Sequence, residues 1–133
     1  MKKIVLFFAM LATITAFSQQ KTVRVLANNY TLSSSDTTFY MPVGGTSNWV
    51  LQFNWSGINP DSTTVTTSVR VTTYNKTHWL DYSGLTTYTI NSSSGDYSFE
   101  DNMLNFDYIG IRVQRTGKIA GTLYAKITLT PNK

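Results

Sequence analysis

The segment Trp49 to Trp55 places the strongest constraint on how this chain folds. Its odd positions carry Trp, Leu, Phe and Trp, and its even positions carry one Val and two amides. This alternation is the period of a β-strand with one apolar face. Because each aromatic side chain buries about 150–250 Å², that face needs a second apolar layer packed against it. The segment therefore predicts a central strand in a sandwich or barrel.

The length and composition favour one all-β domain. At 133 residues the chain is long enough to bury a single core. Charged residues make up only 14%, whereas 21 Thr and 13 Ser supply most of the polarity. Hydroxyl side chains and β-branched Thr suit exposed strand faces, while a helical surface would carry more Glu, Lys and Arg.

Short alternating segments separated by Gly, Asn, Ser and Asp continue from Lys21 to the end of the chain. This spacing predicts an all-β fold with eight or nine strands, and no segment after Gln20 has the apolar period of a helix. Asn28 and Asn29 are expected to form a turn. We expect two four-stranded antiparallel sheets packed as a β-sandwich, in jelly-roll or Greek-key order. The predicted strands are 22–26, 37–41, 49–55, 65–71, 86–90, 97–99, 108–113 and 122–129, with a short piece near 30–32 and a short aromatic segment at 78–82.

The N-terminus has the pattern of a secretory signal peptide. Lys2 and Lys3 precede an apolar run, and small residues end at Ser18. We therefore expect residues 1–18 to be a signal peptide, residues 19–133 to be the single folded domain, and the protein to be exported. The alternative is a retained membrane anchor at residues 4–20, because this uncharged stretch reaches the lower length limit of a spanning helix.

Charge and cysteine content exclude some classes of function. The net charge is +4, and without Lys2 and Lys3 nine basic residues face seven acidic ones. Such a small and scattered excess argues against nucleic-acid binding, which needs clustered Lys and Arg. The chain has no Cys, so core packing and sheet hydrogen bonds must stabilise the fold without disulfides.

Catalytic signals are weak, and the sequence predicts a protein that is not an enzyme. His78 is the only histidine, it lies beside a turn, and no serine sits in a Gly-X-Ser-X-Gly elbow. Acidic residues could hold Ca²⁺ through oxygen ligands at Asp96, Glu100 and Asp101. Glu100 and Asp107 could alternatively form the carboxylate pair of a glycosidase. Solvated turn carboxylates explain the same residues without any site.

Aromatic side chains near turns and on outward strand positions give the most plausible binding surface. From this group we select Trp79, Tyr82 and Tyr88 as candidate ligand-binding residues. Aromatic platforms beside hydroxyl and amide groups suit sugars and also suit protein surfaces. The structural alternative is that Trp79 closes one end of the sandwich, since Trp is highly buried on average.

The C-terminal half resembles a jelly-roll-like β-sandwich domain of bacteriophage virion proteins and related secreted bacterial proteins. The likeness covers roughly residues 65–129 and rests on residue type and spacing. It runs through the turn Tyr74 to Trp79, the strands Thr86 to Ile90 and Tyr97 to Phe99, the segment Phe106 to Val113, and Gly121 to Ala125. The resemblance implies a sandwich used in capsid decoration, fibres or host attachment, with no catalytic residues to carry over.

Together these observations favour a non-enzymatic structural or attachment protein, displayed in many copies on a virion or on an external bacterial surface. Its partners would be copies of itself or other surface proteins, and no cofactor is expected apart from the calcium alternative. The strand Thr22 to Leu26 is a candidate for pairing with a neighbouring subunit. A secreted carbohydrate-binding module is the alternative function, with glycans as the ligands.

Overall fold

The computed structural model describes residues 21–43, 47–73, 76, 78–82, 87–102 and 106–131, with the side chain of Ser47 excluded. The predicted signal peptide and the alternative membrane anchor lie outside the described residues. Within the described residues there are nine strands and no helix. The strands are β1 (Thr22–Thr31), β2 (Asp36–Pro42), β3 (Ser47–Ser56), β4 (Thr63–Thr72), β5 (Leu80–Asp81), β6 (Tyr88–Ile90), β7 (Gly95–Asp101), β8 (Tyr108–Gly117) and β9 (Thr122–Pro131).

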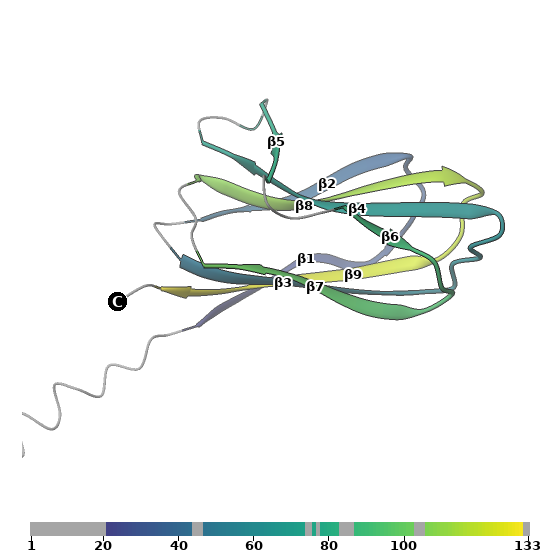
Figure 1. The fold of residues 1–133 in the computed structure, drawn as a ribbon, viewed down its shortest axis with the longest axis horizontal. Coiled ribbons are helices and arrows are strands. Elements are labelled where there is room, and N and C mark those ends of the chain that lie inside the picture. Colours follow the sequence, from purple (N-terminus) through teal and green to yellow (C-terminus); the bar gives the residue numbers. More distant parts are fainter. Residues whose placement is uncertain are drawn as a thin grey trace, which may run out of the picture.

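Two antiparallel sheets pack face to face (Figure 1). One sheet has four strands in the order β1-β9-β3-β7, and the other has the order β2-β8-β4-β5 with β6 also paired to β4. From β1 to β4 the chain changes sheet at every step, and it does so again from β6 to β9. Neighbouring strands therefore come from distant parts of the sequence. The predicted all-β sandwich is confirmed.

The fifth strand of the larger sheet is half of an interrupted strand. β5 pairs with Arg70 and Val71, whereas β6 pairs with residues 65–67 of the same strand. Both lie along one side of β4, so they share a single position in the sheet. Counted as one strand, they leave two four-stranded sheets in the order of a jelly roll.

Alternate residues of the inner strands form the core between the sheets. On β3 the side chains of Trp49, Leu51, Phe53 and Trp55 are all at most 4% exposed, as the alternation predicted. The even positions of β3 face outward and pair with polar residues such as Lys126 and Tyr124 on β9. The opposing layer is supplied mainly by Val65, Val69, Val71, Ile109, Ile111 and Val113.

One local prediction was wrong. Asn28 and Asn29 do not turn the chain, because β1 continues through them to Thr31. Pairing with β9 shifts register between Val25 and Ala27 and again between Ala27 and Tyr30. Asn29 has φ 49°, a conformation that Asn tolerates better than most residues. The local preference of Asn for turns is thus absorbed as an irregularity within a strand.

Candidate functional site

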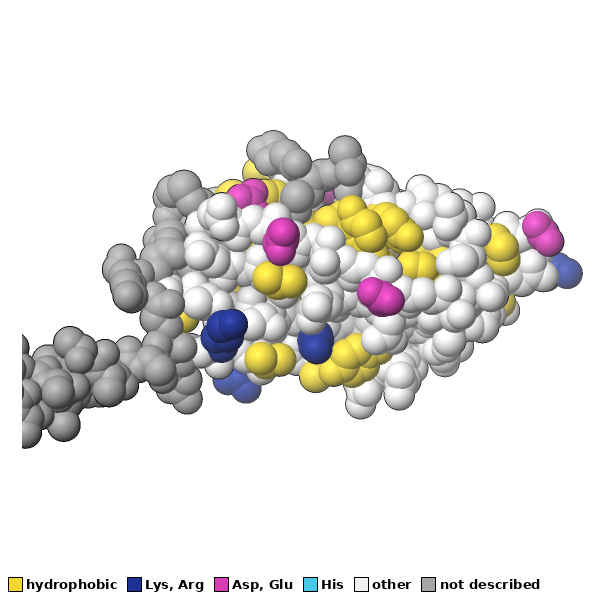
Figure 2. All heavy atoms as spheres, turned by 60° about the horizontal axis from the view of Figure 1, so that its bottom comes forward, with side chains coloured by type: hydrophobic (Ala, Val, Ile, Leu, Met, Phe, Trp, Pro, Cys, Tyr) yellow, Lys and Arg dark blue, Asp and Glu magenta, His cyan; other side chains and the backbone are white. Residues whose placement is uncertain are grey.

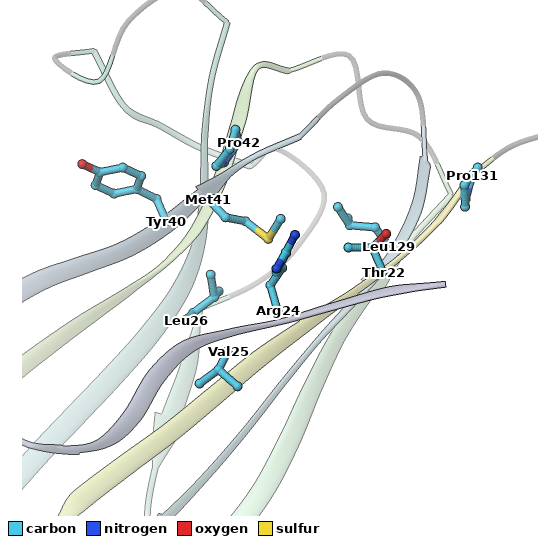
Figure 3. A pocket seen from close by; sticks show the side chains of 9 residues that line it. All are labelled: Thr22, Arg24, Val25, Leu26, Tyr40, Met41, Pro42, Leu129 and Pro131. Carbon is cyan, nitrogen blue, oxygen red and sulfur yellow. The ribbon is translucent and has the colours of Figure 1, made fainter. Parts of the chain in front are cut away.

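An open hollow lies between the edge strands β1 and β2. It is a hollow of about 520 Å³ with Arg24, Leu26, Met41, Leu129 and Pro131 among its lining residues. In Figure 3 the Arg24 side chain rises from β1 toward Met41, while Val25 points the other way. The two sheets are therefore not sealed at this edge, and a cation lies in an otherwise largely apolar opening.

β1 also exposes apolar side chains on the opposite face of its sheet. Val23 is 55% exposed and Val25 is 53% exposed. They pair with Thr128 and Lys126 of β9, whose side chains face away from the core. Because β1 is the last strand of its sheet, one row of its backbone groups has no strand beside it within the described residues. A long edge strand with exposed valines is a template for pairing with another chain.

The opposite edge of the sandwich, formed by β6 and β7, is aromatic and acidic. The rings of Tyr88 and Tyr97 stack with centroids 4.0 Å apart, and both contact Phe53 at 5.9 Å. Tyr97 remains 38% exposed. Asp96 and Glu100 are exposed on the outer face of β7. In Figure 2 the hydrophobic side chains gather in small separate patches on an otherwise mostly polar, uncharged surface.

The three predicted ligand-binding residues do not form one site. Tyr82 packs against the core, with its ring 5.6 Å from that of Trp49 and its hydroxyl donating to Asp101 Oδ2 at 2.8 Å. Tyr88 also packs against the core, beside Trp55 and Tyr97. Both face inward because their segments pair with β4, which positions them at the rim of the core.

Trp79 belongs to a different group, an aromatic patch that we define as Tyr40, Trp79 and Tyr108. The Tyr40 ring lies 5.2 Å from Trp79 and 6.1 Å from Tyr108. Tyr40 and Tyr108 alternate with inward-facing apolar residues on β2 and β8, so they lie on the outer face of the five-stranded sheet. The Lys76 ammonium lies 5.3 Å from the Tyr40 centroid and 5.2 Å from the Tyr108 centroid, a cation–π geometry.

Polar contacts fix the Trp79 side of the patch. Its indole Nε1 donates to the Lys76 carbonyl at 2.9 Å. Its own carbonyl accepts a hydrogen bond from Arg70 Nη2 at 2.6 Å, and Arg70 Nε lies 3.1 Å from Asp81 Oδ1. The prediction missed Tyr40 and Tyr108, although their outward register is visible in the alternation of the two strands.

The surroundings of Tyr82 and Asp36 shift the pKa values of these two groups in opposite directions. Burial, reinforced by the hydrogen bond and charge of Asp101, raises the pKa of Tyr82 to about 12. The hydrogen bond from Arg112 lowers the pKa of Asp36, since the guanidinium favours the charged carboxylate. The Asp36–Arg112 pair links β2 to β8 on the outer face of the larger sheet. Both are structural pairs at strand edges.

A second, smaller hollow of about 200 Å³ lies on the outer face of the four-stranded sheet. It is polar, with Gln52, Asn54, Asp96, Tyr124 and Lys126 among its lining residues. These side chains come from three neighbouring strands, β3, β7 and β9. Tyr124 is thus an outward aromatic residue with amide, carboxylate and ammonium neighbours.

The acidic candidates are distributed over both faces of β7. Asp96 and Glu100 project outward, while Asp101 lies with the inward-facing positions and binds Tyr82. The described residues contain no group of three or more His, Asp or Glu side chains that could hold a metal ion. Calcium binding by Asp96, Glu100 and Asp101 stays a prediction, as does hydrolysis by Glu100 and Asp107. His78 is exposed.

No described helix has the length and apolar character needed to cross a membrane. Comparison with protein-family models finds no match. Comparison with curated proteins finds none either.

Comparison with solved structures finds several similar chains. One is dimeric latent PorU from Porphyromonas gingivalis, at 8% identity and a TM-score of 0.50, with 84% of this chain and 13% of PorU covered. Another is a CBM4 structure, at 10% identity and a TM-score of 0.45, with 86% and 73% covered. A third is the enzymatically active domain of tailspike protein 4 from bacteriophage CBA120, at 11% identity and a TM-score of 0.48, with 82% and 19% covered.

These likenesses concern the fold alone, because the sequence identities are so low. The strand order of the two sheets is the jelly-roll order that the resemblance of the C-terminal half implied. This chain spans only 13% of the PorU chain.

Proposed function

We propose that this chain is a non-enzymatic structural or attachment module, displayed in many copies on a virion or an external bacterial surface. The observation that carries the proposal is β1, a ten-residue edge strand that exposes Val23 and Val25 beside an open hollow. The signal-peptide pattern of residues 1–18 supports export.

The physical argument rests on what an unpaired edge does in water. Natural sheets protect such edges with short strands, charges, Pro or covering loops, because an open edge pairs readily with other chains. β1 is ten residues long and exposes Val23 and Val25 on its outer face. Adding a strand from another chain would satisfy its backbone groups and remove both valines from water. Burying exposed valine surface contributes about 25 cal/mol per Å².

The test is the size of the native protein by light scattering, with and without charges on the outer face of β1. Val23→Lys with Val25→Lys should leave a folded monomer, because both side chains are already exposed. Thr64→Lys with Thr89→Lys adds the same charge to exposed positions of the other sheet and should assemble like the wild type. A wild-type protein that stays monomeric at every concentration would reject the proposal.

The aromatic patch supports a second function, carbohydrate binding. Three rings on one outer sheet face, with Tyr40 43% exposed, form a platform that could stack on a sugar ring while nearby hydroxyl and charged groups bind its hydroxyls. In this proposal Trp79, Tyr40 and Tyr108 bind the sugar, while Tyr82 and Tyr88 stabilise the fold by packing against the core.

Affinity electrophoresis in gels containing soluble xylan, β-glucan or hydroxyethyl cellulose tests this second function. Retardation should disappear in Trp79→Ala and persist in Tyr124→Ala, which removes an outward aromatic from the other sheet. Equal mobility of wild type and Trp79→Ala in every gel would remove the patch as a binding site for these glycans. Circular dichroism of each variant checks that the sandwich remains folded.

A further inference from the structure

The two edges of the four-stranded sheet carry opposite charges. At the β1 edge the charged side chains are Lys21 and Arg24, both exposed. At the β7 edge they are Asp96 and Glu100, which are exposed, and Asp101, which is half-buried. The basic edge of one copy is complementary in charge to the acidic edge of another, whereas two basic edges or two acidic edges repel each other.

Strand direction allows these edges to meet. Every neighbouring pair in the order β1-β9-β3-β7 is antiparallel, so β1 and β7 run in opposite directions. A second copy placed beside the first in the same orientation would therefore lay its β1 antiparallel to the first copy's β7. The antiparallel hydrogen-bond pattern would continue from one copy into the next. The core-facing sides of the two copies' four-stranded sheets would lie on the same side.

From this geometry we propose that copies join head to tail, with β1 of one copy adding to the β7 edge of the next. The inference rests on the proposed function as an assembling module, and it names the partner and the contact surface. Because the joined edges differ, the contact does not close on itself after two copies. Repetition produces an open filament in which one sheet runs through all subunits.

The register across the sheet indicates which residues would meet. Following the pairs from β1 through β9 and β3 to β7 places Val23 in the row of Glu100 and Thr22 in the row of Asp101. If the rows continue into the next copy without a shift, Glu100 faces Val23 and lies diagonal to Lys21. Asp101 then lies diagonal to Arg24, within reach of a long side chain.

The hollow between β1 and β2 fits the same arrangement. Arg24 lies in this opening among apolar residues (Figure 3). The neighbouring copy's β7 edge would bring Asp101 and Tyr82, which are hydrogen-bonded to each other, toward that opening. The cation would then gain a carboxylate partner, and an aromatic side chain would help cover the apolar lining.

Symmetric pairing of β1 with a second β1 is disfavoured by charge when the contact is centred on Val23. Such a contact places Arg24 of one copy diagonal to Arg24 of the other. Like charges on adjacent strands are destabilising. It would also leave the acidic β7 edge unpaired.

Charge reversal on either edge tests the proposal. Lys21→Glu places a like charge diagonal to Glu100, and Glu100→Lys places a like charge diagonal to Lys21. Each variant alone should need an about threefold or higher concentration to assemble, because each contact loses one attraction and gains one repulsion. A 1:1 mixture should assemble at the wild-type concentration, since both kinds of contact between the two variants pair Glu with Lys. Wild-type assembly by the β7 variant alone would overturn the proposal.

Cysteine crosslinking reports the register, and the chain has no native Cys to interfere. Val23→Cys and Glu100→Cys are made in separate chains, mixed and mildly oxidised. A disulfide between the two different chains is expected, because directly opposed residues on adjacent strands have Cα atoms about 4.5–5.5 Å apart. A crosslinked Val23→Cys dimer would instead show symmetric pairing. If the wild type assembles but no mixed crosslink forms, only this inference fails; a strictly monomeric wild type rejects the proposed function too.

Discussion

β3 and β1 are ten-residue strands of the same sheet, and both pair with β9. β3 turns Trp49, Leu51, Phe53 and Trp55 into the core, whereas β1 leaves Val23 and Val25 exposed and places Arg24 in an open hollow. The central strand is therefore committed to the fold. Much of the apolar surface of β1, the edge strand, remains available to a partner. The two strands therefore have different roles, because β3 stabilises the core and β1 can pair with another chain.

The largest contrast should come from shortening one side chain on each strand. Phe53 contacts Trp55, Tyr88, Tyr97 and Phe99, so Phe53→Ala should lower the free energy of unfolding by about 3–5 kcal/mol. Val25→Ala should change it by about 0.5 kcal/mol or less. Urea unfolding followed by circular dichroism measures both. Comparable losses in the two variants would show that β1 belongs to the core.

A smaller contrast concerns backbone positions with little space. Gly95 lies opposite Trp55, and a Cβ atom added there would stand 2.6 Å from the indole ring. We expect Gly95→Ala to cost about 1–3 kcal/mol, because the ring would have to move within a packed core. On β1, Asn29→Gly should change stability by about 0.5 kcal/mol or less, since Gly accepts positive φ. An unaffected Gly95→Ala variant would mean that the end of β3 is loosely packed.

The same contrast explains what the sequence could predict. The central strand could be predicted because four large apolar residues at alternate positions fit few structures other than a strand with one buried face. The turn expected at Asn28 and Asn29 failed because long-range pairing with β9 overrides the local preference of Asn. Strand order, which local patterns do not specify, brings Tyr40 and Tyr108 beside Trp79. Tyr82 and Tyr88 were predicted to lie on the surface because of their positions near turns or on outward strand positions, yet pairing of β5 and β6 with β4 directs them inward.

Alkaline pH should weaken the packing at the beginning of β3, where Tyr82 contacts Trp49. Burial first, and then Asp101, raises the pKa of Tyr82 from 10.0 to about 12 in the folded state. The folded protein thus holds the phenol proton more tightly than the unfolded chain. This contribution to stability is complete below pH 10 and is lost as the pH rises toward 12.

Tyr82→Phe removes the ionisable group and should therefore reduce the loss of stability over that pH range. Asp101→Asn, which removes the charge beside the phenol, should reduce it less. Thermal unfolding of the three proteins at several pH values measures the effect. Identical alkaline slopes for wild type and Tyr82→Phe would show that the Tyr82 proton is not linked to folding.

The smallest effect on the fold is expected at Arg24, although its substitution should alter assembly. Arg24→Leu replaces an exposed cation with an apolar side chain in the hollow beside Leu26 and Met41. The free energy of unfolding should change by about 0.5 kcal/mol or less, because no described partner of Arg24 is lost.

An inward-pointing charge protects an edge from unselective pairing. The leucine variant should therefore aggregate with a weaker salt dependence than the wild-type assembly, because only the Lys21–Glu100 attraction remains, whereas Arg24→Lys should keep the full dependence. Light scattering at low and high salt measures this difference between the variants, because salt screens a contact between charges and weakens it, while an apolar contact is not weakened. Wild-type salt dependence in Arg24→Leu would exclude Arg24 from the contact and leave Lys21, the backbone and the valines of β1 to bind the partner.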